Sequence, residues 1–157
     1  MQTLISQKLD IIRSHQTTRP VETVPIARAL GNEVYYANGW PSDISGYIKK
    51  SDNPDLNFDI FVNKDHHPNR RRFTIAHEIA HAVLHADRIG DGITEDGLLR
   101  SGLPDPIEWQ ANDLAADILM PWHLLTTDLR STYDIGDLAK MFKVSKSAMA
   151  IRLGVPQ

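Results

Sequence analysis

Apolar positions recur with helical spacing at both ends of the chain and change to a strand-like pattern between them. Leu4, Ile5, Leu9 and Ile12 fall on one face and predict an amphipathic opening helix. A second short helix is predicted over residues 25–30, where Gly31 ends it. Three short strands follow, separated by turn-forming residues, and they are expected at residues 34–36, 44–49 and 58–62.

The second half of the chain is predicted to be mainly helical. A strong helical pattern covers residues 70–85, and another covers residues 107–120 and stops at a proline. Between them, residues 86–106 are rich in Gly, Asp and Pro and predict a long loop of the kind that often shapes or covers a functional cleft. Three further helices are expected near residues 122–130, 135–142 and 146–153.

Length and composition indicate one soluble domain over residues 1–157, since no repeat or linker divides the chain. A net charge of −3 provides no general attraction to nucleic acid or to an anionic membrane. The chain shows no apolar run long enough to span a membrane and no signal-peptide core, so we expect a cytoplasmic protein. Cysteine is absent, which restricts any metal site to histidine and carboxylate ligands.

Two histidines lie one helical turn apart within the helix predicted over residues 70–85. His77 and His81 therefore project from the same face and can bind one metal ion. Glu78 lies between them, rotated by about 100° from His77, where it can accept a proton from a zinc-bound water without binding the metal. The alternative is an ordinary amphipathic helix whose histidines are solvated or hydrogen-bonded in the core, and the pentad formed by residues 77–81 (HEIAH) does not by itself exclude it.

A carboxylate on the next helix strengthens the zinc interpretation. On a helical projection of residues 107–120, Glu108 and Asn112 lie at the edge of the apolar stripe, toward the core. A buried carboxylate needs a partner, which a zinc ion provides. Asp113 is the competing candidate, but it lies on the polar face. His85 continues the histidine series too far along the helix for one tetrahedral ion, so we expect it to pack or to support the ligands.

Two stretches of the chain resemble a known family. Residues 72–85 (RFTIAHEIAHAVLH) and 108–121 (EWQANDLAADILMP) are similar to the core of the ImmA/IrrE family of metallo-endopeptidases, with weaker similarity at residues 24–31, 44–46 and 60–63. The family commonly has Gly where Ala80 stands and Phe where Leu114 stands. Neither difference affects an expected ligand.

This resemblance implies a fold, a site and a substrate class. The expected fold is α+β, a zincin-like helical domain with a small, mostly antiparallel three-stranded sheet and C-terminal helices. One Zn²⁺ per chain would bind to His77, His81 and Glu108, with Glu78 as the general base. Family members typically cleave a helix-turn-helix (Xre-like) repressor or belong to toxin–antitoxin-like pairs. A protein substrate, either a helix-turn-helix regulator or an antitoxin, is therefore expected.

Several alternatives stay open. The chain could be a non-catalytic regulatory module, or a toxin–antitoxin component, that acts by docking its partner. Residues 134–154 resemble a helix-turn-helix, in which Ser145 would cap the second helix. The negative net charge favours a core-closing role for these helices over direct nucleic-acid binding. The sequence determines neither the oligomeric state nor the oxyanion-stabilising residue, whose candidates are His66, His67, His123, Tyr47 and Tyr133.

Overall fold

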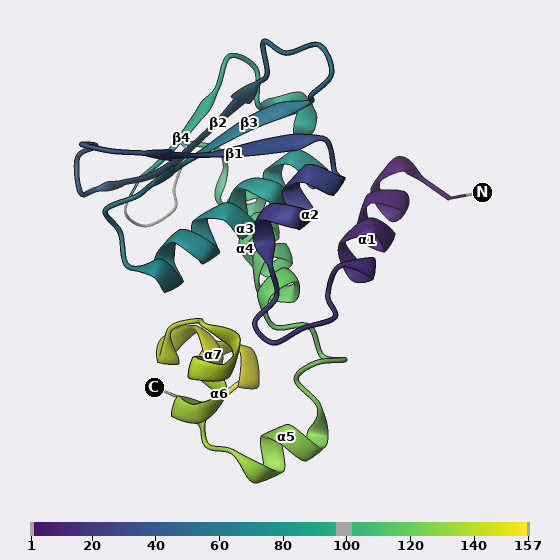
Figure 1. The fold of residues 1–157 in the computed structure, drawn as a ribbon, viewed down its shortest axis with the longest axis vertical. Coiled ribbons are helices and arrows are strands. Elements are labelled where there is room, and N and C mark those ends of the chain that lie inside the picture. Colours follow the sequence, from purple (N-terminus) through teal and green to yellow (C-terminus); the bar gives the residue numbers. More distant parts are fainter. Residues whose placement is uncertain (1, 97–101, 157) are drawn as a thin grey trace.

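A four-stranded sheet covers one side of the molecule, and helices pack beneath it (Figure 1). The structure is a computed structural model that describes residues 2–96 and 102–156. The strands are β1 (Asn32–Ala37), β2 (Ile44–Lys50), β3 (Phe58–Asn63) and β4 (Ile93–Asp96), in the order β1-β3-β2-β4. β2 runs antiparallel to both neighbours, whereas β1 and β3 are parallel. The expectation of three strands is therefore wrong in number, although the α+β class holds.

The helices agree closely with the sequence pattern, except near residue 127. They are α1 (Leu4–Ser14), α2 (Thr23–Ala29), α3 (Pro68–Leu84), α4 (Asp105–Leu119), α5 (Thr127–Thr132), α6 (Ile135–Phe142) and α7 (Lys146–Leu153). The helix expected over residues 122–130 begins later, because the Thr126 side chain accepts a hydrogen bond from the Leu129 amide and caps α5 there. No helix among the described residues is long and apolar enough to cross a membrane.

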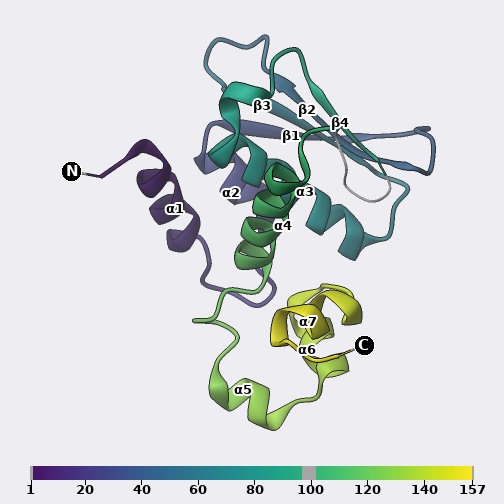
Figure 2. The same ribbon diagram turned by 180° about the vertical axis from the view of Figure 1, so that it is seen from behind.

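α3 is the central helix of the molecule. It packs against β2 and β3 on one side and against α4 on another (Figures 1 and 2). Ten successive residues, 74–83, are buried, so this helix lacks the exposed polar face of a surface helix. Pro68 occupies its first turn, and the His67 side chain accepts a hydrogen bond from the Asn69 amide at the entry. The pentad therefore lies in the most enclosed part of the fold.

The stretch expected to be a loop, residues 86–106, contains more structure than its composition indicates. A 3₁₀ turn (Ala86–Arg88) and strand β4 lie within it, and α4 already begins at Asp105. Tyr47 of β2 holds the approach to β4: its hydroxyl donates to the Asp91 carbonyl at 3.1 Å, and its ring occupies the space of a Cβ at Gly92. Gly92 has a φ of +141°, which favours glycine.

The C-terminal helices α6 and α7 pack against each other and contribute buried side chains to the core cluster. Ser145 caps α7 as expected, by accepting a hydrogen bond from the Ala148 amide. Arg152 reaches back to the end of α4, where it donates to the Met120 carbonyl at 3.0 Å and pairs with Asp117 at 2.8 Å. Its guanidinium also lies 4.4 Å from the centre of the Trp122 ring. The Arg152 guanidinium is therefore held by contacts within the protein.

Candidate metal centre

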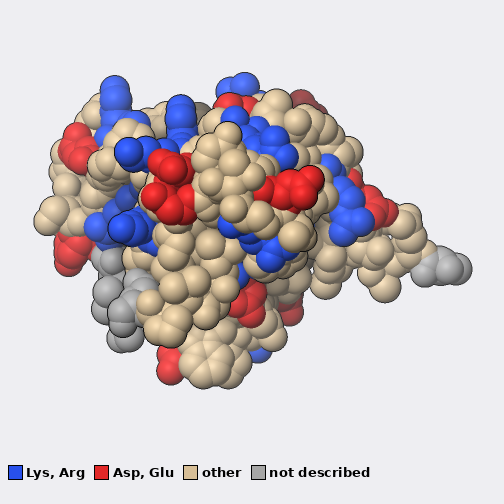
Figure 3. Space-filling view, turned by 90° about the horizontal axis from the view of Figure 1, so that it is seen from below, with Lys and Arg blue, Asp and Glu red and all other residues tan. Residues whose placement is uncertain are grey.

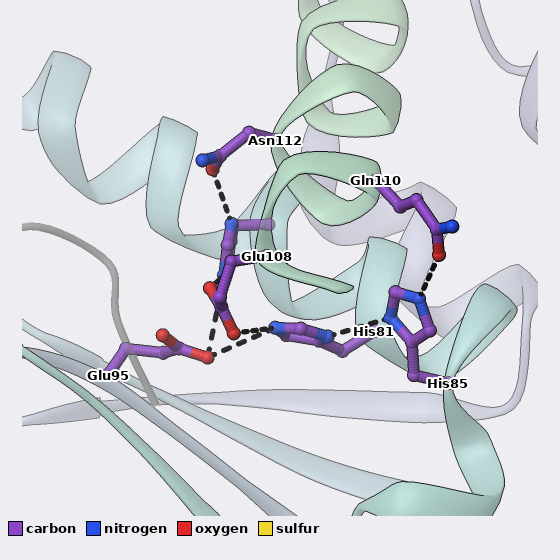
Figure 4. A network of polar contacts seen from close by, with 7 residues as sticks. His81, His85, Glu95, Glu108, Gln110 and Asn112 are labelled. Atoms are coloured by element: carbon purple, nitrogen blue, oxygen red, sulfur yellow. Dashed lines mark hydrogen bonds and ion pairs between the residues drawn. The ribbon is translucent and has the colours of Figure 1, made fainter. Parts of the chain in front are cut away.

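Four buried side chains from three elements converge beneath the sheet. His77 and His81 come from α3, Glu108 comes from α4 and Glu95 from β4. One potential ligand atom of each lies within 4.8 Å of the others. Figure 4 shows Glu95 reaching in from the sheet side and Glu108 from the helix, with His81 between them and His85. The structure thus brings together the three residues proposed as ligands from sequence and adds a fourth.

The distances within this cluster fit a tetrahedral zinc ion. His77 Nε2 lies 3.2 Å from Glu108 Oε2 and 3.4 Å from Glu95 Oε1. His81 Nε2 lies 3.3 Å from Glu108 Oε1 and 3.2 Å from Glu95 Oε1. Nitrogen and oxygen ligands about 2.0 Å from a zinc at the centre of a tetrahedron are about 3.3 Å from one another. The donor set and these four separations therefore fit this metal.

The contacts between the imidazole nitrogens and the carboxylate oxygens are longer than ordinary hydrogen bonds between charged groups. Charge-assisted N–H···O bonds are usually about 2.7–2.9 Å long, shorter than the 3.2–3.4 Å separations in the cluster. Among the described residues, neither imidazole Nε2 has a hydrogen-bond partner, and neither do the two carboxylate oxygens of Glu95. Buried polar atoms are rarely left in this way unless an ion or water satisfies them.

Polar neighbours orient both imidazoles. His77 Nδ1 lies 2.8 Å from Asn112 Oδ1 of α4. Because an amide oxygen only accepts, Nδ1 carries the hydrogen and the Nε2 lone pair of the neutral ring points into the cluster. Asn112 is thus a supporting residue one turn beyond Glu108, on the side of α4 that faces the site.

His81 is held by a relay through His85, which agrees with the supporting role expected for that histidine. His85 Nε2 lies 2.8 Å from Gln110 Oε1 and donates to it, and His85 Nδ1 lies 3.0 Å from His81 Nδ1. Burial lowers the pKa of His85 and so favours its neutral form, in which Nδ1 accepts. His81 therefore donates through Nδ1 and turns Nε2 toward the carboxylates (Figure 4).

The carboxylates control the protonation of this cluster. Burial alone disfavours charge on His77, yet Glu108 and Glu95 outweigh it and raise the pKa of this imidazole to about 10. The same opposition raises the pKa of His81. Burial opposes ionisation of Glu95, but its contacts with the two histidines are stronger and lower its pKa. The cluster therefore favours binding of positive charge, either as protons on the imidazoles or as a metal ion.

Glu78 lies beside the cluster without belonging to it. Its side chain is fully buried, and it is absent from the group of four that can share an ion. Burial, and then the nearby charge of Glu95, raise the pKa of the Glu78 carboxyl well above its usual value. Gly46 of β2 packs over it: a Cβ on this glycine would lie 3.7 Å from Glu78 Cγ. This placement suits a group that exchanges protons next to a metal.

The other candidates from the sequence lie outside the cluster. Asp113 is exposed on α4. The five residues considered for the oxyanion are also not part of the four-residue group. Four of them are engaged elsewhere: His66 with the Ser42 carbonyl, His67 with the Asn69 amide, His123 with the Gln16 carbonyl and Tyr47 with the Asp91 carbonyl.

Glu95 was not predicted from the sequence. The one local signal is the alternation of buried Ile93, exposed Thr94 and buried Glu95 on β4, which places a carboxylate where an apolar residue is expected. Such a short alternation, surrounded by Gly and Asp, is not distinguishable from a loop without the neighbouring strand.

Comparison with known proteins identifies the family. The model of the IrrE N-terminal-like domain, Peptidase_M78, matches residues 27–154. The radiation response metalloprotease IrrE of Deinococcus radiodurans is 37% identical over 93 residues, which cover 57% of this chain and 28% of that protein. A Mycobacterium tuberculosis transcriptional regulator has a similar fold, with a TM-score of 0.61 and 22% identity over 96% of this chain and 47% of that one.

This chain thus spans less than half the length of either relative. The family match itself extends from α2 to the end of α7 and includes all four residues of the candidate metal centre. The chain belongs to the ImmA/IrrE family of metallopeptidases.

Proposed function

We propose that this chain is a zinc endopeptidase in which His77, His81 and Glu108 hold the metal and Glu78 is the general base. The observation that carries the proposal is the buried cluster itself. Its four contacts between imidazole nitrogens and carboxylate oxygens are 3.2–3.4 Å long, close to the separation of ligands in a tetrahedral zinc site. Glu78, whose carboxyl pKa is raised well above its usual value, lies beside the cluster on α3. Perturbed carboxyl groups of this kind are typical of catalytic sites.

The chain's own residues perform positioning and proton transfer. A bound zinc supplies Lewis acidity, which lowers the pKa of a coordinated water to about 7 and polarises a carbonyl. Glu78 accepts the proton of the attacking water and delivers it to the leaving amine nitrogen. Asn112 and His85 hold the two imidazoles in the tautomers that expose Nε2. Glu78 is fully buried, so the surrounding core keeps bulk water away from its carboxyl group during proton transfer.

The proposed substrate is a protein, specifically a helix-turn-helix transcriptional regulator or an antitoxin in the cytoplasm. Support for this class comes from the family, whose members resemble this chain in both long motifs. Direct DNA binding is not favoured. The face seen from below α5, α6 and α7 carries acidic and basic side chains interspersed (Figure 3), and Arg152 is already paired with Asp117.

A second candidate is a docking module that regulates its partner without cleaving it. The observation in its favour is enclosure: His77, Glu78 and His81 have no exposed surface, and Glu108 is only 5% exposed. A peptide bond must reach these residues for hydrolysis to occur. The two candidates therefore differ in whether the site opens to a substrate, and cleavage products distinguish them.

The test compares cells that express wild type, Glu78→Gln or Asp113→Asn. Glutamine retains the volume of Glu78 but cannot act as a base, whereas Asp113 is an exposed carboxylate of α4 and provides the matched control. We expect new protein N-termini, labelled by amine-specific chemistry, with wild type and Asp113→Asn but not with Glu78→Gln.

Zinc content measured on the three purified proteins completes this experiment. Equal zinc in Glu78→Gln and wild type shows that only the base was removed. If Glu78→Gln produces the same biological effect as wild type, and wild type generates no new N-termini, the docking module is the correct function.

A further inference from the structure

Glu95 of β4 is a fourth buried side chain of the cluster, in addition to the three ligands of the proposed zinc site. Catalytic zinc sites have three protein ligands and leave the fourth position to water or substrate, whereas structural sites are closed by four protein ligands. His77, His81 and Glu108 account for three. Glu95 Oε1 lies 3.4 Å from His77 Nε2 and 3.2 Å from His81 Nε2, the same spacing that Glu108 shows. By distance from the two imidazoles, Glu95 is equivalent to Glu108, although Glu95 makes both contacts through one oxygen and Glu108 uses both of its oxygens.

The burial of Glu95 supports this equivalence. Its side chain is fully buried, and neither of its carboxylate oxygens has a hydrogen-bond partner among the described residues. A fully buried carboxylate without a compensating partner is very costly. Positive charge at the centre of the cluster is the compensation that the geometry provides, because both imidazole Nε2 atoms lie within 3.4 Å of Glu95 Oε1.

The backbone around Glu95 directs it into the site. Among the described residues β4 pairs with β2 alone, and Glu95 is in register with Gly46 after an irregularity between Ile44 and Gly46. Gly46, which has no side chain, allows β2 to pack closely against α3 beside Glu78. The Tyr47 hydroxyl fixes the Asp91 carbonyl just before the strand. Because alternate residues of a strand face opposite sides, Ile93 and Glu95 both point inward.

We propose that Glu95 is a fourth protein ligand that closes the metal site and holds the peptidase in a latent form. This inference rests on the proposed function, since it requires a metal on His77, His81 and Glu108. Substrate reaches the metal only after the Glu95 carboxylate leaves it. The remaining three ligands then form the two-histidine, one-glutamate set of a catalytic site, with Glu78 beside the released position.

Cobalt provides a spectroscopic test, because Co²⁺ absorption reports the ligands of a tetrahedral site and azide binds only where a position is open. The proteins are wild type, Glu95→Ala and Thr94→Ala, whose changed residue is exposed on the same strand and serves as the matched control. Co²⁺ affinity is measured by competition with a chromophoric chelator. Azide is then titrated into each cobalt-loaded protein while the visible spectrum is recorded.

We expect Glu95→Ala to bind one Co²⁺ with an affinity reduced at least about tenfold, and its spectrum to change with azide. Wild type and Thr94→Ala should bind tightly and respond to azide only at far higher concentration. Should alanine leave the protein insoluble, Glu95→Gln undergoes the same measurements, since it removes the charge with almost no change in volume.

Two results would overturn the proposal in different ways. If Glu95→Ala, or Glu95→Gln in its place, matches wild type in both affinity and azide response, Glu95 is not a ligand, while the three-ligand zinc site stands. If wild type itself binds no stoichiometric Co²⁺ or Zn²⁺, the proposed function fails and the inference fails with it. The metal content of wild type separates these two outcomes.

Discussion

At the scale of single residues, His77 and His81 each turn one imidazole nitrogen toward the cluster and the other toward a polar partner. The partner of His77 is the Asn112 amide oxygen at 2.8 Å. We expect Asn112→Ala to weaken zinc binding by about 10- to 100-fold, because the ring loses the contact that fixes its tautomer and orientation. Asn112→Asp keeps an acceptor and should stay close to wild type, as should Asp113→Ala at the exposed neighbouring position. Competition with a chromophoric chelator measures all four proteins, and equal affinities throughout would contradict this role for Asn112.

Protonation of His77 couples metal binding to pH. The Glu108 and Glu95 carboxylates outweigh the effect of burial and raise the pKa of His77 to about 10, so protein stripped of metal keeps this imidazole protonated at neutral pH. A metal binds only the neutral ring. Zinc uptake at pH 7.5 should therefore release at least one proton from the cluster, and zinc affinity should increase with pH up to about 10. Calorimetry in two buffers of different ionisation enthalpy counts the protons; identical heats in both would show that none is released.

The sequence identifies some residues of the candidate site and not others, for a physical reason. His77 and His81 are found because helical spacing converts a separation of four residues into a shared face. Glu108 is found because its place at the edge of an apolar stripe implies burial, and it is 5% exposed. Glu95 depends on a strand pairing between β2 and β4 that no local pattern specifies. Glu95 comes close to the two histidines and Glu108 only when α3, α4 and β4 have packed together.

At the scale of elements, the helices are predicted by local sequence signals, whereas the edge of the sheet depends on contacts between distant parts of the chain. α6 and α7 begin and end where the sequence predicts, because caps and apolar spacing are local signals. β4 is four residues long at the edge of the sheet, and it is stabilised by β2 rather than by its own composition. The parallel pairing of β1 with β3 is likewise non-local, since β2 lies between them in sequence.

The close packing of β2 on α3 depends on Gly46. A Cβ at this position would lie 2.7 Å from Thr74 Cγ2 and 3.3 Å from the Phe61 carbonyl oxygen. Gly46→Ala should therefore destabilise the protein by about 1–3 kcal/mol, because strand and helix must move apart. Urea unfolding measures the loss. Thr74→Ser removes the opposing methyl group, so the double variant should recover part of the stability. Strictly additive effects in this cycle would show that the contact between Gly46 and Thr74 is not the cause.

At the scale of the whole molecule, the C-terminal helices extend the core of the peptidase rather than stand apart from it. Phe142 of α6 and Met149 of α7 are fully buried and belong to the same apolar cluster as Ile75 and Ile79 of α3. Arg152 ties α7 to the end of α4 through the Met120 carbonyl and Asp117. This arrangement predicts one cooperative unit over the described residues, in which loss of packing at the C-terminus is transmitted to the metal cluster.

The variant Phe142→Ala tests whether α6 and α7 unfold together with the rest of the molecule. Removing a fully buried aromatic side chain should cost about 3–5 kcal/mol of unfolding free energy, because a cavity is left in the shared core. Ile151→Ala is the matched control: it truncates an apolar side chain on α7 that is 68% exposed and should change stability little. Urea unfolding followed by circular dichroism, and in parallel by release of bound Co²⁺ absorbance, should give coincident single transitions for both variants, with the Phe142→Ala midpoint shifted down. If Phe142→Ala unfolds in two steps and retains the cobalt spectrum through the first, α6 and α7 form an independent unit.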